Sequence, residues 1–173
     1  MEKATFAGGS FWAMEEAFRE VPGVTATRVG YTGGHVPHPS HAQVRSGTTG
    51  HAEAVEVTFD PDRISYENLL EVFFNNHDPT QLNRQGPDRG TEFRSAIFYH
   101  SAAQKDAAQL RRLVLTKMNR FQGPIATEFC AATEFYPAEE KHQHFLAKEA
   151  AHHHPWHPPV AEALESTRNH RGK

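Results

Sequence analysis

The sequence predicts an α+β fold, in which one two-layer domain has a mixed, mainly antiparallel sheet flanked by helices. Segments that alternate like strands interleave along the chain with segments that have the apolar spacing of helices. The connections differ in length, and residues 24–31 and 51–59 can form an antiparallel hairpin, which favours this fold over a doubly wound parallel sheet. The length of 173 residues suits a single domain with its own core.

Three strands and two helices are expected in the first half of the chain. The strands are indicated by alternation or by a short apolar run, and the helices by apolar residues three and four positions apart. In order, these elements are a strand at 4–9, a helix that begins near Ser10, strands at 24–31 and 51–59, and a helix at 65–76. The glycine pair before Ser10 permits a tight turn, and the glycines and prolines of 32–40 predict a loop.

The second half of the chain opens with a polar segment, 78–92, that is expected to be a loop. The same signals then predict a strand at 94–99, a helix at 102–119, a strand at 124–130 and a helix at 138–149. Prolines and adjacent histidines follow, so the chain is divided into a domain at 1–151 and a His/Pro-rich tail at 152–173.

The composition narrows the classes of partner. Charged residues make up 23% of the chain and the net charge is -3, so nucleic acid and anionic membrane surfaces are not expected partners. No apolar run approaches the roughly 20 residues that span a bilayer, and no signal peptide is visible, so we expect a soluble, cytoplasmic protein. It is also expected to be a monomer. Cys130 is the only cysteine, which excludes a disulfide within the chain.

Two residues are candidates for chemistry on pattern alone. Ser10 stands at a helix start, where free N–H groups and the helix dipole favour a nucleophile or an anion, although serine is also a common N-cap. Glu53 falls on the apolar face of its strand, where burial would raise the pKa and make it a proton donor. Alternatively, Glu53 stands at a solvated strand end.

The chain contains 13 histidines, which could bind a metal ion, but no metal site is assigned from the sequence. His35, His38 and His41 are regularly spaced, yet intervening prolines oppose a helix that would bring them together. Weak candidates for a transition metal are His41, His51 and Glu53, with His51 read first as a structural residue. Adjacent tail histidines seldom converge on one ion; they are His152, His153, His154 and His157.

Five motifs occur in the order found in a known family. They are Gly8 to Trp12, Gly30 to His35, Ser46 to Val55, Asn76 to Gln81, and Arg84 to Ile97. Over residues 4 to 145 the chain resembles the peptide-methionine (S)-S-oxide reductases of the A class. The resemblance implies a ferredoxin-like core and an enzyme whose cysteine thiolate attacks a sulfoxide sulfur.

The resemblance also assigns roles to individual positions. Phe11 and Trp12 would form the pocket for the methyl group, Glu53 would protonate the sulfoxide oxygen, and Asp88 would be the supporting carboxylate. Three positions depart from the family: Ser10 replaces the nucleophilic cysteine, and His41 and Phe93 replace two tyrosines. Positions where relatives often carry further cysteines are Ala13 and Arg45.

These departures predict that reduction by the thiol route is absent, because a serine hydroxyl is far less acidic than a thiol of pKa about 8.5. A pocket for the sulfoxide or thioether group of a peptide or small molecule is expected to remain, lined by Phe11, Trp12 and Phe93. Two alternatives stay open. Ser10, His41 and Glu53 or Asp88 could support acyl transfer, isomerisation or cyclisation. A metal could instead bind His41 and Glu53 together with His51 or a tail histidine.

Overall fold

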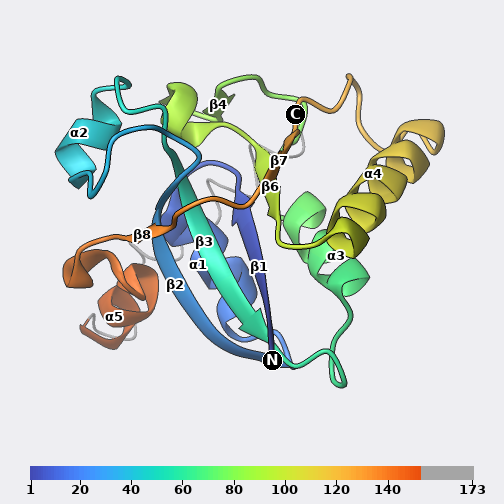
Figure 1. The fold of residues 1–173 in the computed structure, drawn as a ribbon, viewed down its shortest axis with the longest axis horizontal. Coiled ribbons are helices and arrows are strands. Elements are labelled where there is room, and N and C mark those ends of the chain that lie inside the picture. The colour runs from blue at the N-terminus through green and yellow to red at the C-terminus, as the bar shows by residue number, and fades with distance from the viewer. Residues whose placement is uncertain (153–173) are drawn as a thin grey trace.

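A mixed six-stranded sheet forms the centre of the structure, a computed structural model that describes residues 1–152 (Figure 1). Its strands are β1 (Glu2–Ala7), β2 (Val24–Thr32), β3 (Ala52–Phe59), β6 (Ala96–Tyr99), β7 (Glu128–Ala131) and β8 (Tyr136–Pro137). They lie in the order β7-β6-β1-β3-β2-β8, and every neighbouring pair is antiparallel except β6 and β7. The predicted α+β class and the hairpin between β2 and β3 are therefore confirmed.

The longer helices are α1 (Phe11–Arg19), α3 (Tyr66–Asn75) and α4 (Ala102–Lys117). The helix α1 connects β1 to β2 with β3 between them, and α3 precedes β6, which lies on the other side of β1. Two interlocked strand–helix–strand units of this kind are the ferredoxin-like arrangement. Among the described helices, none is both long and apolar enough to cross a membrane.

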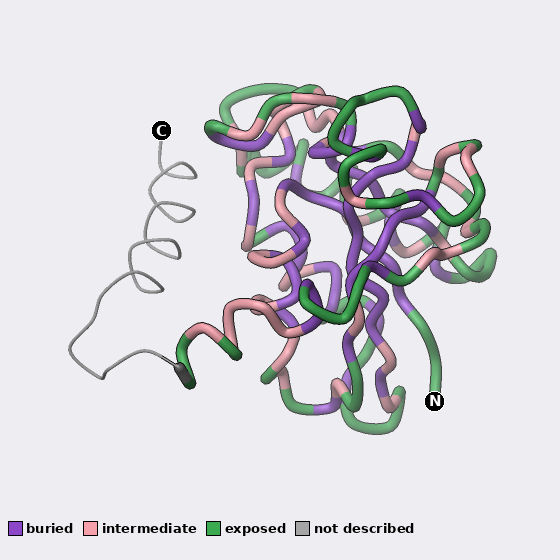
Figure 2. The backbone as a smooth tube through the Cα atoms, turned by 90° about the vertical axis from the view of Figure 1, so that its left-hand side faces the viewer, coloured by how far each residue is buried: buried purple, intermediate pink, exposed green. Residues whose placement is uncertain are grey.

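The core lies between the sheet and these helices. Phe6 of β1 stacks on Phe18 of α1 at 5.1 Å and on Phe73 of α3 at 5.0 Å between ring centroids. The opposite face of the sheet buries mostly small side chains, among them Ala52 and Ala54. Figure 2 shows the buried residues concentrated in the middle of the molecule, with the exposed residues on the outer loops. Each buried phenylalanine contributes roughly 1.5–3 kcal/mol, so this aromatic stack fixes α1 and α3 on the sheet.

The strand β3 confirms the alternation read from the sequence. Val55, Val57 and Phe59 contribute to the core under the helices, and Glu53 lies in register with them on the same face. Glu53 is 3% exposed, which excludes the solvated strand end. His51 precedes the strand rather than forming part of it.

Several short elements occur where the sequence indicated none or another type. These are α2 (His41–Arg45), the hairpin β4 (Arg84–Gln85) and β5 (Asp88–Arg89), the 3-10 turn η1 (Thr91–Phe93), and β8. The strand expected at 124–130 begins only at Glu128. Elements of two to five residues are too short to show a period, so their positions depend on tertiary contacts.

The helix expected at 138–149 is wrong in its first part. The chain forms a 3-10 turn, η2 (Glu140–His142), then breaks, and α5 (Phe145–His152) follows. The break occurs because His144 has a left-handed φ of 52° and its N–H donates to Glu15 Oε1 at 2.7 Å. The helix α5 reaches the end of the described residues, so the division of the chain at residue 151 stays a prediction.

The side chain of Gln143 holds this break against the edge of the sheet. Its Oε1 accepts the Val29 N–H at 2.8 Å, and its Nε2 donates to the Val29 and Ala138 carbonyls at 2.8 and 3.0 Å. The amide side chain therefore pairs with the backbone of Val29 in the way that a neighbouring strand would.

We predict that Gln143→Ala lowers the free energy of unfolding by about 2–3 kcal/mol. The reason is that the buried Val29 N–H loses its acceptor, and an unpaired buried amide costs roughly 1–3 kcal/mol. Urea unfolding measures the change, with the exposed Gln122→Ala as the matched control. Equal stability of the two variants would contradict this assignment.

Candidate active site

Ser10 is the N-cap of α1, where the chain turns out of β1. Its Oγ accepts a hydrogen bond from the backbone N–H of Trp12 at 3.3 Å. The preceding Gly9 has a φ of 92°, in the left-handed region that favours glycine. The N-cap interpretation of Ser10 is confirmed, and the hydroxyl also lies at the positive end of the helix dipole.

Glu53 lies beneath this helix start and has an unusual protonation state. Its Oε1 accepts the Phe11 N–H at 3.3 Å. Burial raises the pKa of Glu53 to about 7 against the opposing effects of that hydrogen bond and of Arg45, and the charges of Glu92 and Asp88 raise it further. The carboxyl is thus divided between its acidic and ionised forms at neutral pH, as a proton donor requires.

His41, the first residue of α2, stands beside this carboxyl. Its Nε2 lies 3.6 Å from Glu53 Oε2, and its ring stacks on Phe11 with centroids 6.0 Å apart. Burial, followed by the charges of His142 and Arg45, lowers the pKa of His41. The imidazole is therefore mainly neutral at pH 7, with one nitrogen able to donate and the other able to accept.

Aromatic rings from two distant segments enclose the site. Trp12 stacks on Phe145 of α5 at 4.1 Å between centroids, and the ring of His142 lies 5.6 Å from both Phe11 and Trp12 and 4.5 Å from His41. Within residues 1–152, Trp12 Nε1 and both ring nitrogens of His142 are buried and have no hydrogen-bond partner. Because buried polar atoms are normally satisfied, these nitrogens mark a place where a polar ligand atom would be stabilised.

The two remaining predicted residues, Asp88 and Phe93, come from the segment that follows β4. Phe93 of η1 is 2% exposed and carries the Arg45 guanidinium 4.8 Å above its ring. Asp88, in β5, is close enough for its charge to raise the pKa of Glu53. The structure thus brings Phe11, Trp12, His41 and Glu53 together at the start of α1, next to Ser10. Asp88 acts on Glu53 through its charge, and Phe93 packs on Arg45.

His51 is not part of this group. Its Nδ1 accepts the Gly34 N–H at 2.9 Å and its Nε2 contacts the Val36 carbonyl at 2.7 Å, so both nitrogens are engaged with backbone. Across the part of the chain that the structure describes, no group of three histidine, cysteine or acidic residues is placed to hold a metal ion. The side chains of the tail histidines lie outside the described residues.

Sequence reasoning missed three residues that complete the site. The Tyr31 hydroxyl donates a hydrogen bond to Glu139 Oε1 at 3.2 Å, and burial, followed by the charge and hydrogen bond of Glu139, raises the pKa of the phenol. His142 Nε2 lies 4.0 Å from Glu139 Oε2. Tyr31 belongs to a glycine-rich motif that could have drawn attention to it, but His142 and Glu139 carry no signal in a segment that reads as an ordinary helix.

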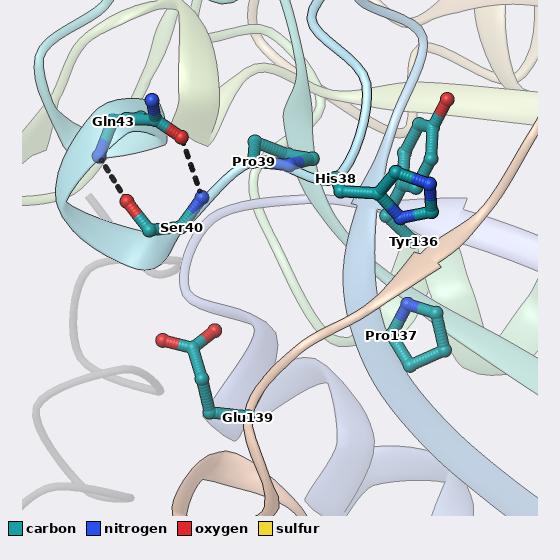
Figure 3. A pocket seen from close by; sticks show the side chains of 7 residues that line it. All are labelled: His38, Pro39, Ser40, Gln43, Tyr136, Pro137 and Glu139. Carbon is teal, nitrogen blue, oxygen red and sulfur yellow. Dashed lines mark hydrogen bonds between the residues drawn. The ribbon is translucent and has the colours of Figure 1, made fainter.

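An open cavity of about 550 Å³ adjoins the site on the side of Glu139 (Figure 3). It is lined by His38, Pro39, Ser40, Gln43, Tyr136, Pro137 and Glu139. Ser40 and Gln43 form a reciprocal capping box that fixes the start of α2, with bonds of 2.8 and 3.1 Å. Figure 3 shows the Glu139 carboxylate across the cavity from these two residues, so the cavity is lined by two segments that are far apart in the sequence, 38–43 and 136–139.

The chain is similar to proteins named peptide methionine sulfoxide reductase MsrA. It is 55% identical to one from Methanosarcina acetivorans over 86% of this chain and 79% of that protein. It is 56% identical to one from Methanothermobacter thermautotrophicus over 85% and 87% of the two chains. The match to the protein of this name from Geobacter sulfurreducens is 55% over 86% and 91%.

Solved structures agree with these matches. Mxr1 from Saccharomyces cerevisiae in reduced form superposes with a TM-score of 0.79 at 34% identity, over 92% of this chain and 90% of that one. Methionine sulfoxide reductase A of Corynebacterium diphtheriae gives 0.77 at 34% identity, over 90% and 78%. The family described as peptide methionine sulfoxide reductase matches residues 2–171. The chain therefore belongs to the peptide methionine sulfoxide reductase family.

Proposed function

We propose that this family member binds a methyl sulfoxide or thioether group at the start of α1 but does not reduce it by thiol chemistry. The observation that carries the proposal is the position of Ser10: its hydroxyl caps α1 while the next backbone N–H, that of Phe11, is donated to Glu53. The first turn of α1 therefore positions both Ser10, which stands where the family has its nucleophilic cysteine, and Glu53, the proton donor.

The chemistry of serine rules out the family's usual step. A thiolate attacks sulfur and leaves a sulfenic acid, whereas an attacking serine would have to form a peroxidic oxygen–oxygen product that is no analogue of it. Cys130 does not replace the missing thiol, because it lies in the edge strand β7 and burial raises its pKa. A low thiolate fraction at neutral pH follows.

The other residues keep roles in binding. Phe11 and Trp12 supply the apolar wall for the methyl group, and protonated Glu53 donates a hydrogen bond to the sulfoxide oxygen. Asp88 supports the raised pKa of Glu53. Phe93 is an apolar wall without a hydroxyl, and His41 offers a neutral imidazole beside Glu53. The substrate class is a peptide or a small molecule that carries such a sulfur group.

One alternative function has an observation in its favour. The 3.6 Å approach of His41 to Glu53 is that of an acid–base pair, which would suit isomerisation, cyclisation or acyl transfer. Within residues 1–152, however, no imidazole is hydrogen-bonded to Ser10, whose Oγ is engaged by Trp12. A metal at His41 and Glu53 would lack His51, whose nitrogens are engaged elsewhere, and elemental analysis of untagged protein tests that reading.

We predict that the chain fails to reduce methionine sulfoxide with dithiothreitol and that Ser10→Cys/His41→Tyr/Phe93→Tyr gains this activity. The variant restores the thiol and two hydroxyls in a pocket that keeps Phe11, Trp12 and Glu53. Turnover is measured as methionine formed. Adding Glu53→Gln should then lower kcat by about 10²-fold, as expected for loss of a general acid.

The same assay is run with Cys130→Ser in both backgrounds as the control. Activity of the unmodified chain that is lost in Cys130→Ser would contradict the proposal, because it would be thiol chemistry at Cys130. An inert triple variant that still unfolds cooperatively would contradict the pocket assignment.

We predict that affinity for a blocked methionine sulfoxide is constant below about pH 7 and falls about tenfold per pH unit above it. The acid form of Glu53 donates the hydrogen bond, and its pKa of about 7 sets where that form is lost. Calorimetric titration measures the profile. Glu53→Gln, which donates at every pH, should flatten it, and an unchanged slope in this variant would reject Glu53 as the donor.

A further inference from the structure

The outer face of α4 carries an apolar stripe that the site does not use. Leu110, Leu113, Val114 and Met118 are 60%, 50%, 37% and 66% exposed. Among the described residues, they are four of the six large hydrophobic side chains that are exposed. The helix lies outside α3, on the other side of the molecule from α2 and α5 (Figure 1). Clustered exposed apolar residues of this kind are typical of a contact surface.

The stripe has the spacing of a helix–helix seam. The face of α4 that packs inward buries Gln104, Ala108 and Leu115. The opposite face presents Asp106, Leu110, Leu113 and Lys117, all exposed and spaced at i, i+4, i+7 and i+11. This 4-3-4 spacing is that of the a and d positions of a heptad repeat, which face a partner helix.

The order of these four residues makes the seam complementary to itself. Two copies of α4 that cross antiparallel about a two-fold axis midway between Leu110 and Leu113 place each Leu110 opposite the other copy's Leu113. The same register places each Asp106 opposite the other copy's Lys117. A parallel pair would instead set like charges against each other, which is destabilising.

The two charged ends of the seam are also available for such pairing. The other basic side chains of α4 are engaged: Arg111 pairs with Glu71, Arg112 lies over Phe129, and Lys105 lies over Tyr99. Within residues 1–152, neither Asp106 nor Lys117 forms an ion pair. The antiparallel register that pairs Leu110 with Leu113 is therefore also the one that pairs Asp106 with Lys117.

We propose that α4 is an isologous interface through which a second copy of this chain docks antiparallel. A two-fold contact requires one surface to fit itself, and the seam meets that requirement. One helix pair is smaller than the roughly 800 Å² per partner of a stable interface, so the dimer is weak and reversible. The monomer expected from the sequence is then the form at low concentration, and the site on the other side stays open in both forms.

Sedimentation equilibrium of the full chain tests the proposal. The expected result is a monomer–dimer equilibrium with a Kd below about 1 mM, which corresponds to about 4 kcal/mol of association free energy. Asp106→Lys and Lys117→Asp should each weaken the dimer about tenfold, because each sets two like-charge pairs across the axis. The double exchange should restore it, and a mixture of the two single variants should form a heterodimer.

Leu110→Gln should abolish the dimer, and Leu82→Gln is the matched control because Leu82 is 69% exposed in another segment. Circular dichroism verifies that each variant is folded. A chain that is monomeric at 1 mM overturns the proposal. So does a dimer that survives Leu110→Gln, or a double exchange that fails to restore association.

Discussion

The hydrogen bond between the Phe11 N–H and the Glu53 carboxyl is the contact on which the rest of the site depends. It joins the first turn of α1 to β3, so the helix that carries Ser10 at its N-terminus is fixed in position relative to the centre of the sheet. The carboxyl accepts this bond in either protonation state, because a neutral acid still has a carbonyl oxygen. The acid proton is then free for a bound group, and burial, rather than a partner cation, keeps it in place at neutral pH.

The parts of the fold that were predictable are those whose signal is local. Alternation placed Glu53 on the buried face, and the glycine pair placed Ser10 at the start of a helix. The helix expected at 138–149 was wrong because its break depends on Gln143 and His144, whose partners Val29 and Glu15 lie 114 and 129 residues away. Contacts of such separation leave no period in the sequence.

The same break explains why His142 was missed. It turns His142 and Phe145 onto Phe11 and Trp12, which a continuous helix would not do. Glu15 is 1% exposed and is held from two sides, by the Thr27 hydroxyl at 2.9 Å and the His144 N–H. Residues 138–145 are therefore part of the packed structure, and loss of their anchors would open the aromatic wall of the site as well as lower stability.

His41 and Phe93, which stand where the family is expected to have tyrosines, both affect the pKa of Glu53. A neutral His41 beside Glu53 adds no cation, and Phe93 adds no dipole, so both preserve the low polarity that raises the pKa of Glu53. Arg45 acts in the opposite direction, and its stacking on Phe93 keeps the guanidinium near enough to lower that pKa. The balance leaves Glu53 close to half protonated at pH 7. The hydrogen bond proposed here, from the acid form of Glu53 to a neutral acceptor, depends on this balance.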